Sequence, residues 1–125
     1  MIEISIVSPI LNEEETILKF LEKLNDTLKD LEVSYEIILV LDPCTDNTEK
    51  ILLEEANKNK LLKVITLSRR FGQPAATLAG LSHANGNYVV VIDSDLQDPP
   101  ELIKDMYKKI NDGFDVVYAE REKRH

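Results

Sequence analysis

The sequence predicts an α/β fold, a three-layer α/β/α sandwich built around a mainly parallel sheet. Short segments rich in apolar and β-branched residues alternate along the chain with longer segments whose apolar residues recur at helical spacing. Alternation of this kind indicates βαβ units, in which each helix connects two parallel strands. The segment Tyr88–Ile92 is apolar without interruption, as expected for a central parallel strand that is buried on both faces.

Five strands and four helices are expected. The strands are expected at residues 2–8, 35–41, 62–67, 88–92 and 114–118, and the helices at about 12–31, 47–59, 75–84 and 99–111. The first helix would have Asn12 as its N-cap and Glu15 at the capping-box position, and either Thr45 or Asp46 would cap the second. Small residues in the third helix would let it pack closely on the sheet. Since no repeat or linker interrupts the pattern, residues 1–125 are expected to form a single domain.

The chain has 125 residues and a net charge of −8, with 43% hydrophobic and 30% charged residues, which is typical of a soluble globular domain. The negative charge argues against nucleic acid as a partner, because phosphate binding requires clustered basic residues. A single cysteine, Cys44, excludes an internal disulfide and a cysteine metal site. No apolar run approaches the ~20 residues of a membrane helix, and the N-terminus has no signal-peptide pattern. We therefore expect a cytoplasmic segment that associates with a membrane only through a longer parent chain.

Two carboxylates, Asp93 and Asp95, directly follow the 88–92 strand. Residues i and i+2 of an extended chain point the same way, so both would project from the carboxyl end of the strand, where open α/β sheets bind ligands. Two like charges side by side need compensation, and a divalent metal bound to an anionic substrate supplies it. A turn-forming role is the alternative for this pair. Asp98 is interpreted as the N-cap of the helix that begins at Pro99, with Glu101 closing a capping box.

Other candidate site residues also follow strands. They are Pro9, Asn12 and Glu13 after the first strand, Asp42 after the second, Arg69 and Arg70 after the third, and Arg121 after the fifth. In a parallel sheet all of these positions lie along one edge. An edge with carboxylates, Arg side chains and helix N-termini suits a metal-bound diphosphate. Arg69 and Arg70 are equally compatible with solvated turn charges, and His83 and Cys44 are interpreted as structural residues.

Several common nucleotide and catalytic motifs are absent. No G-x-G-x-x-G follows the first strand and no G-x-x-x-x-G-K-[ST] occurs, which leaves a dinucleotide fold and a P-loop unsupported. A G-x-S-x-G nucleophile elbow is absent as well.

Five motifs, in this order along the chain, resemble those of family 2 glycosyltransferases of the GT-A fold. They are Pro9-Ile10-Leu11-Asn12-Glu13-Glu14, Val40-Leu41-Asp42-Pro43-Cys44-Thr45-Asp46, Arg69-Arg70-Phe71-Gly72-Gln73, Asp93-Ser94-Asp95-Leu96-Gln97-Asp98-Pro99-Pro100-Glu101 and Tyr118-Ala119-Glu120-Arg121. Within that family the chain looks most like the polyprenyl-phosphate and dolichyl-phosphate sugar transferases. The D-x-D-L-Q-D-P-P-E stretch is the part that is specific to this branch.

The resemblance implies the Rossmann-like, nucleotide-sugar-binding half of a GT-A domain. The implied reaction is the inverting, metal-dependent transfer of a sugar from a UDP- or GDP-linked donor to a polyprenyl phosphate or a cell-envelope glycan. The implied donor-site residues are Pro9, Leu11 and Glu13 at the base and ribose, Asp42 at the nucleoside and Arg121 at phosphate. Asn12 and Ser94 are implied to belong to the same nucleotide-sugar site. Asp93, Asp95 and Gln97 would hold Mg²⁺ or Mn²⁺. A polyprenyl monophosphate is already ionised and needs positioning more than deprotonation, and any catalytic base would lie beyond His125.

The chain departs from the family pattern in three ways. Leu11 stands where the family often has Tyr, and Leu41-Asp42-Pro43-Cys44 stands where it often has Asp-Asp-Gly-Ser. The family's domain also continues where this chain stops, so the single domain is expected to be truncated at its C-terminus. An alternative is therefore a non-catalytic nucleotide-binding or interaction fragment. The exposed edge of such a sheet would also favour a homodimer.

Overall fold

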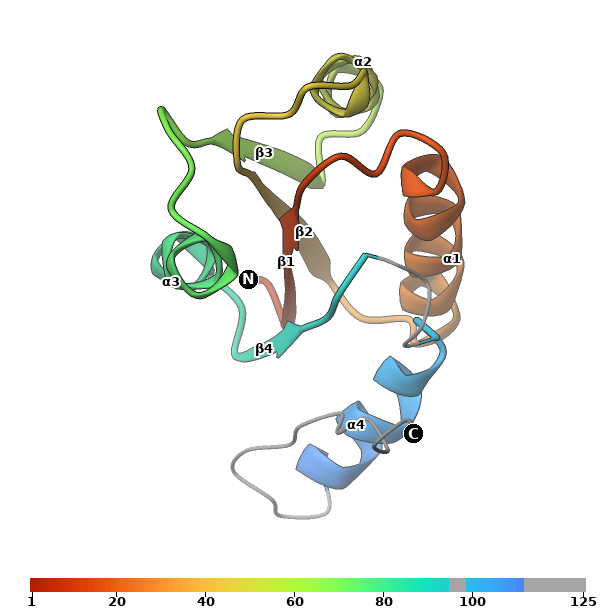
Figure 1. The fold of residues 1–125 in the computed structure, drawn as a ribbon. Coiled ribbons are helices and arrows are strands. Elements are labelled where there is room, and N and C mark those ends of the chain that lie inside the picture. Colours follow the sequence, from red (N-terminus) through yellow and green to blue (C-terminus); the bar gives the residue numbers. More distant parts are fainter. Residues whose placement is uncertain (95–98, 112–125) are drawn as a thin grey trace, which may run out of the picture.

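A computed structural model describes residues 1–94 and 99–111 of the chain. Strands and helices alternate through this part of the molecule (Figure 1). They are β1 (Ile4–Ile10), α1 (Ile17–Asp30), β2 (Tyr35–Leu41), α2 (Thr48–Lys58), β3 (Leu62–Thr66), α3 (Gln73–His83), β4 (Tyr88–Val91) and α4 (Leu102–Asn111). The alternation predicted from the sequence is confirmed for these eight elements. The expected fifth strand, at 114–118, lies outside the described residues.

The four described strands form one parallel sheet in the order β3-β2-β1-β4. β1 and β2 lie in the middle and pair along their whole lengths, from Ile4 opposite Tyr35 to Ile10 opposite Leu41. Every residue of both strands is buried. The sequence predicted β4 as a central strand buried on both faces, and this is wrong for the described sheet: β4 lies at its edge, with Val89 37% and Val91 42% exposed, because α3 packs over β1 and β2. In this order the carboxyl ends of all four strands lie at the same edge of the sheet, which confirms the basis for placing the site there.

Pro9 lies inside β1, although the sequence predicted that this strand ends at Ser8. The carbonyl oxygen of Val7 accepts a hydrogen bond from Ile92 N, on the β4 side of β1. Backbone groups two residues apart on a strand point to the same side, so the backbone N of Pro9 also faces β4. The β1–β4 pairing stops at Val7 opposite Val91, so the missing N–H of Pro9 falls beyond the last paired residue of β4. A proline is tolerated in a strand at such a position.

The helices form two layers on opposite faces of the sheet (Figure 1). On one face α1, α2 and α4 bury the larger apolar cluster, which includes Phe20, Leu52 and Ile103. On the other face α3 packs against β1 and β2 over a smaller cluster. A Cβ atom on Gly80 of α3 would overlap Val7 Cγ1, which confirms the prediction that small residues bring this helix close to the sheet. The three-layer α/β/α architecture is thus observed.

The start of α1 differs from the prediction. Thr16, not Asn12, is the N-cap residue, and no side chain caps the helix. Asn12 has a φ of +50°, in the left-handed region that Asn tolerates better than most residues. Its side chain bonds to the loop after β2 instead of to the N-terminus of α1. The predicted capping box of Asn12 and Glu15 is therefore wrong.

The other helix starts agree more closely with the sequence. Asp46 Oδ1 accepts a hydrogen bond of 3.0 Å from Thr48 N at the start of α2, as expected for one of its two predicted caps. The formal N-cap residue is Asn47. Before α4, a turn with Leu102 N bonded to Pro99 O at 2.9 Å occupies the first positions of the predicted helix. The capping role predicted for Asp98 lies outside the described residues. None of the helices in the described ranges is long and apolar enough to cross a membrane.

The amino end of the sheet buries a charged network, formed by Ser5, Glu36, Lys63, Asn85 and Gly86. Glu36 is 1% exposed and accepts bonds from Ser5 Oγ at 2.6 Å, Lys63 Nζ at 2.6 Å and Asn85 N at 2.7 Å. Gly86 N donates to Ser5 Oγ at 2.8 Å. Burial alone would raise the pKa of Glu36, but the hydrogen bonds and the positive charge of Lys63 outweigh it and lower this pKa to about 2. We call this group the amino-end network.

Candidate functional site

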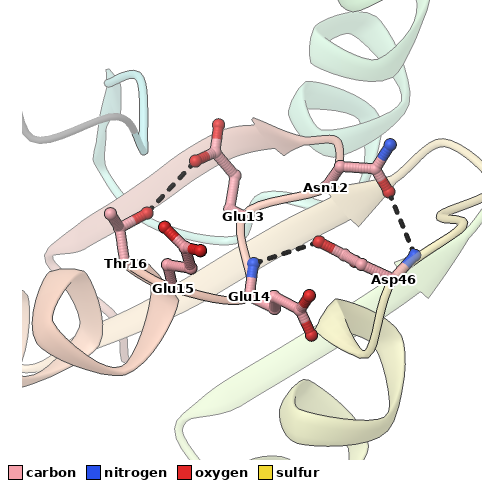
Figure 2. Close-up of a pocket in the computed structure, with 6 residues that line it drawn as sticks. All are labelled: Asn12, Glu13, Glu14, Glu15, Thr16 and Asp46. Atoms are coloured by element: carbon pink, nitrogen blue, oxygen red, sulfur yellow. Dashed lines mark hydrogen bonds between the residues drawn. The ribbon is translucent and has the colours of Figure 1, made fainter.

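The loops that follow β1 and β2 are tied together at the carboxyl edge of the sheet. Asn12 Oδ1 accepts bonds from Thr45 N at 2.8 Å and from Asp46 N at 3.4 Å. Glu14 N donates in the other direction, to Asp46 Oδ2 at 3.3 Å (Figure 2). Glu13 N donates to Thr48 Oγ1 at 2.8 Å. These bonds fix the position of each loop relative to the other.

Asp46 is the centre of this carboxyl-end network, which we define as Asn12, Glu13, Glu14, Asp46 and Thr48. Its Oδ1 accepts from both the backbone N and the hydroxyl of Thr48, at 3.0 Å and 2.6 Å. Burial raises the pKa of Asp46, but the hydrogen bonds from Thr48 and Glu14 outweigh burial, so the net pKa lies below its ordinary value. The carboxylate therefore remains ionised across the physiological pH range.

An open pocket of about 210 Å³ lies over these loops (Figure 2). It is lined by Asn12, Glu13, Glu14, Glu15, Thr16 and Asp46. Within the described ranges, none of its carboxylates pairs with a Lys or Arg. Ionised carboxylates only accept hydrogen bonds, so this pocket suits the N–H and O–H groups of a base or a sugar and disfavours phosphate.

Asp42 follows β2 directly and is 5% exposed. Its side chain crosses to the loop between β3 and α3, where Oδ2 accepts from Gly72 N at 3.1 Å and Oδ1 from Phe71 N at 3.4 Å. The same loop carries Arg69, whose guanidinium carbon lies 4.9 Å from the centroid of the Phe71 ring. Arg69, Arg70 and Phe71 are all exposed. The two arginines therefore lie on the loop that bonds to Asp42, and neither of them lines the acidic pocket.

The structure places the predicted site residues at the carboxyl edge as far as it describes them. Pro9 and Asp42 are buried, Leu11 and Glu13 are half-buried, and Asn12 is exposed. Asp93 is half-buried and Ser94 is 3% exposed, both just after β4. Asp95, Gln97 and Arg121 lie outside the described residues, so the predicted metal set and phosphate contact are not tested.

Three residues that shape this edge were not singled out as site residues from the sequence. Glu14, Asp46 and Thr48 connect the two loops through hydrogen bonds that span 32 to 35 residues. Asp46 and Thr48 carry a local signal, since an Asp two residues before a Thr at a helix start commonly bonds its backbone N. This signal predicts that Asp46 caps α2, but it does not predict the hydrogen bonds to the loop after β1.

Cys44 and His83 have the structural roles expected for them. Cys44 is half-buried, its Sγ donates to Asp42 O at 3.3 Å, and burial raises the pKa of its thiol, which makes it a poor nucleophile. His83 Nδ1 lies 2.9 Å from the carbonyl oxygen of Ala79 in its own helix. Neither residue lines the acidic pocket.

The residues that could hold a divalent metal lie mainly outside the described part of the chain. Among the described residues, no group of three or more His, Cys, Asp or Glu side chains is arranged to hold a metal. Of the predicted ligands, only Asp93 is described, at the carboxyl end of β4. The full predicted set of Asp93, Asp95 and Gln97 offers oxygen donors only, which is the donor type that Mg²⁺ and Mn²⁺ take. The donor chemistry therefore fits such an ion.

Comparisons with curated proteins give consistent results. The chain is 45% identical over 123 residues to an uncharacterized glycosyltransferase of Synechocystis sp., covering 98% of this chain and 39% of that protein. It is 41% identical over 124 residues to the undecaprenyl-phosphate 4-deoxy-4-formamido-L-arabinose transferase of Proteus mirabilis, covering 98% of this chain and 38% of that protein. The chain thus spans about two-fifths of the length of these relatives.

Solved structures and a family model agree with the curated relatives. The structure resembles Staphylococcus aureus TarS 1–349 in complex with UDP-GlcNAc, with a TM-score of 0.69 and 29% identity over 89% of this chain and 32% of that one. It is also similar to glucosyl-3-phosphoglycerate synthase of Mycobacterium tuberculosis, with a TM-score of 0.65 and 27% identity over 89% of this chain and 40% of that one. The structural neighbours are GT-A glycosyltransferases. The sequence model described as glycosyl transferase family 2 matches residues 5–125, and the chain belongs to this family.

Proposed function

We propose that the chain forms the donor-binding part of an inverting glycosyltransferase that transfers a sugar from a nucleoside diphosphate to a polyprenyl phosphate. The observation that carries this proposal is the carboxyl edge of the sheet, where an acidic pocket lies over the loops after β1 and β2 and an exposed Arg-bearing loop follows β3. Family membership supports sugar transfer. The TarS complex with UDP-GlcNAc supports a nucleotide sugar, and the name of the Proteus relative supports a polyprenyl phosphate.

The nucleoside end of the donor is assigned to the edge formed by Pro9, Leu11, Asn12, Glu13 and Asp42. Glu13 lines the acidic pocket and would accept hydrogen bonds from hydroxyl or N–H groups of the ribose or base. Leu11 is half-buried and would give the base an apolar contact. Because the two loops are fixed in place by their mutual hydrogen bonds, little ordering entropy would be lost when the nucleoside binds.

The diphosphate end is assigned to Asp93, Ser94, Asp95, Gln97 and Arg121. Asp93, Asp95 and Gln97 would hold Mg²⁺ or Mn²⁺, and this ion would supply positive charge to the departing nucleoside diphosphate. Arg121 would contact phosphate oxygens. Ser94, which is buried beside Asp93, belongs to the same assigned group.

The acceptor reacts as an anion in this proposal. A phosphate oxygen of the polyprenyl monophosphate attacks the anomeric carbon from the face opposite the leaving group, a new C–O bond forms, and the bond to the nucleoside diphosphate breaks. Because the attacking oxygen is already ionised at neutral pH, no general base in the described residues is required. A lipid acceptor would place the enzyme at the cytoplasmic face of a membrane.

Calorimetric titration with UDP and GDP, each with and without Mn²⁺, tests the donor site. We expect metal-dependent binding of one of the two nucleotides, and we expect Asp95→Ala to abolish it. The matched control is Asp26→Ala, which removes an exposed Asp from α1. Binding that needs no metal and survives Asp95→Ala would refute the assigned metal site.

The rival hypothesis is a non-catalytic nucleotide-binding or interaction fragment. It is motivated by the coverage of the relatives, of which this chain spans 38–39%. Sugar transfer to a polyprenyl phosphate by the 125-residue chain would refute this rival. A self-associating fragment would instead show a dimer mass in solution.

A further inference from the structure

We infer that Asp42 is a positioning residue, which holds the turn Arg69–Gly72 in place so that the turn, and not the Asp42 carboxylate, forms one wall of the nucleotide site. The inference rests on the proposed function for the identity of the ligand. It assigns to Asp42 a role different from the nucleoside contact that the family resemblance implies. It also makes the exposed turn the part of this wall that a ligand touches.

The geometry of Asp42 leaves little of its carboxylate available to a ligand. The residue is 5% exposed, and its backbone is fixed by the bond from Asp42 N to Ile10 O at 3.2 Å. Both carboxylate oxygens already accept backbone N–H groups, from Gly72 at 3.1 Å and from Phe71 at 3.4 Å. Asp42 is also absent from the lining of the acidic pocket, where Glu13 and Asp46 are found.

The turn needs such an anchor because its own conformation is unusual. Gly72 has a φ of +89°, a value that non-glycine residues rarely adopt. Its carbonyl oxygen accepts the first bond of α3, from Ala76 N at 3.1 Å, and no side chain of its own caps the helix. The Asp42 carboxylate therefore lies at the N-terminus of α3, where negative charge is stabilised by the helix dipole. The Asp42 side chain therefore connects the end of β2 to the start of α3.

The turn presents groups that suit a nucleotide. Phe71 is 46% exposed, and the Arg69 guanidinium lies over its ring at 4.9 Å. An exposed aromatic face can stack on a base or sugar, and a guanidinium can pair with phosphate. Unlike the acidic pocket, this turn carries positive charge, so the two features would bind different parts of one ligand.

Amide hydrogen exchange of the protein without nucleotide tests whether Asp42 holds the turn. In Asp42→Asn, one oxygen is replaced by an NH₂ group that cannot accept, so we expect exchange of the Phe71 and Gly72 amides to accelerate about 10-fold or more. The matched control is Glu36→Gln, which alters the buried carboxylate at the other end of the sheet. It should accelerate exchange at Asn85 and leave Phe71 and Gly72 unchanged. Equal exchange at these two amides in the wild type and Asp42→Asn would overturn the inference.

Trypsin cleavage after Arg69 and Arg70 gives a second readout of the same turn. Both residues are exposed, so a turn released from Asp42 should be cut faster in Asp42→Asn than in the wild type, whereas Glu36→Gln should not increase the rate. This measurement does not depend on assigning individual amides.

A double-mutant cycle with UDP and GDP then separates positioning from direct contact. If Asp42 acts through the turn, Asp42→Asn and Gly72→Ala each lower the nucleotide affinity by similar factors. The double variant then has the same affinity as the single variant that binds less tightly. If Asp42 contacts the nucleoside itself, the two losses multiply and the inference is wrong. A wild-type protein that binds neither nucleotide counts against the proposed function, whereas the exchange measurement still decides whether Asp42 holds the turn.

Discussion

The two ends of the sheet both carry buried or half-buried carboxylates, but they use them differently. At the amino end, Glu36 is matched by the Lys63 ammonium and by two further donors, and it is almost fully buried. At the carboxyl end, Asp46 and Asp42 accept from neutral N–H and O–H groups in the described structure. The carboxylates of the acidic pocket there have no described cation beside them.

This difference separates stability from function. Removing a buried charge that is fully paired leaves its partners unsatisfied and destabilises the folded state, and such a charge offers nothing to a ligand. Negative charge that remains unneutralised at an open pocket costs stability through repulsion and is retained where a ligand or ion supplies the compensation. We therefore expect substitutions at the amino end to affect unfolding first, and substitutions at the carboxyl end to affect nucleotide binding first.

The largest expected effect on stability is at Glu36. Replacing it with Ala leaves the Ser5 hydroxyl, the Asn85 N–H and the Lys63 ammonium without their shared acceptor, and we expect a loss of about 3–5 kcal/mol in the free energy of unfolding. Urea denaturation measures this loss. The matched control is Glu15→Ala in the exposed loop before α1, which should change the free energy by less than about 0.5 kcal/mol. Equal effects at the two positions would contradict the comparison.

The pH dependence of the free energy of unfolding should also report on Glu36. The pKa of Glu36 falls from an ordinary 4.5 to about 2 on folding. A carboxyl group with a lowered folded-state pKa stabilises the protein fully above its unfolded pKa and loses that contribution as the pH falls through its folded pKa. We expect about 3 kcal/mol to disappear between about pH 4.5 and pH 2. In Glu36→Gln this part of the pH dependence should be absent; an unchanged profile would contradict the assignment.

Two glycines offer a matched comparison of the two ends. A Cβ on Gly86 would lie 2.7 Å from Ser5 N and 2.9 Å from Ile4 C, both backbone atoms. Among the atoms of residues 1–94 and 99–111, a Cβ on Gly72 would meet only Pro74 Cδ, at 3.9 Å, so its expected cost is that of a positive φ. We expect Gly86→Ala to cost about 2–3 kcal/mol and Gly72→Ala about 1 kcal/mol. Thermal or urea unfolding would measure the loss of stability in each variant. A larger loss in Gly72→Ala than in Gly86→Ala would be inconsistent with the packing.

The smallest expected effect is at Ser8. Its hydroxyl is the buried side-chain polar atom without a hydrogen-bond partner in the described structure, and the residue is fully buried in β1. Removing an unsatisfied buried hydroxyl relieves a desolvation cost, so Ser8→Ala should leave stability unchanged or raise it by up to about 1 kcal/mol. A destabilisation of more than about 1 kcal/mol would show that the hydroxyl has a partner.

The sequence predicted the eight described elements because each depends on local patterns. The apolar runs Ile37–Leu41 and Tyr88–Ile92 marked β2 and β4, and helical periodicity marked α1 and α4. The parallel order of the strands then placed Asp42, Asp93 and Asn12 at one edge without any further information. The fold class and the placement of these residues at one edge of the sheet were therefore predictable.

The connections within the site were not predictable from these patterns. Asn12 was expected to cap its own helix because Asn is a common N-cap, but a bond to Thr45 N, 33 residues away, prevails. The bond from Gly72 N to Asp42, 30 residues apart, likewise depends on how two loops meet at the sheet edge. Local propensity cannot describe a hydrogen bond whose partner is supplied by the tertiary fold.

The most direct test of the central claim is a calorimetric titration of UDP and GDP, in the presence of Mn²⁺, into the wild type and a matched pair of Glu→Gln variants. Glu13→Gln lies in the acidic pocket at the carboxyl end, and Glu36→Gln lies at the amino end. We predict that Glu13→Gln weakens binding about 10-fold, whereas Glu36→Gln, studied where it remains folded, binds as the wild type does. Weaker binding in Glu36→Gln together with unchanged binding in Glu13→Gln would contradict the assignment of the nucleotide site to the carboxyl edge.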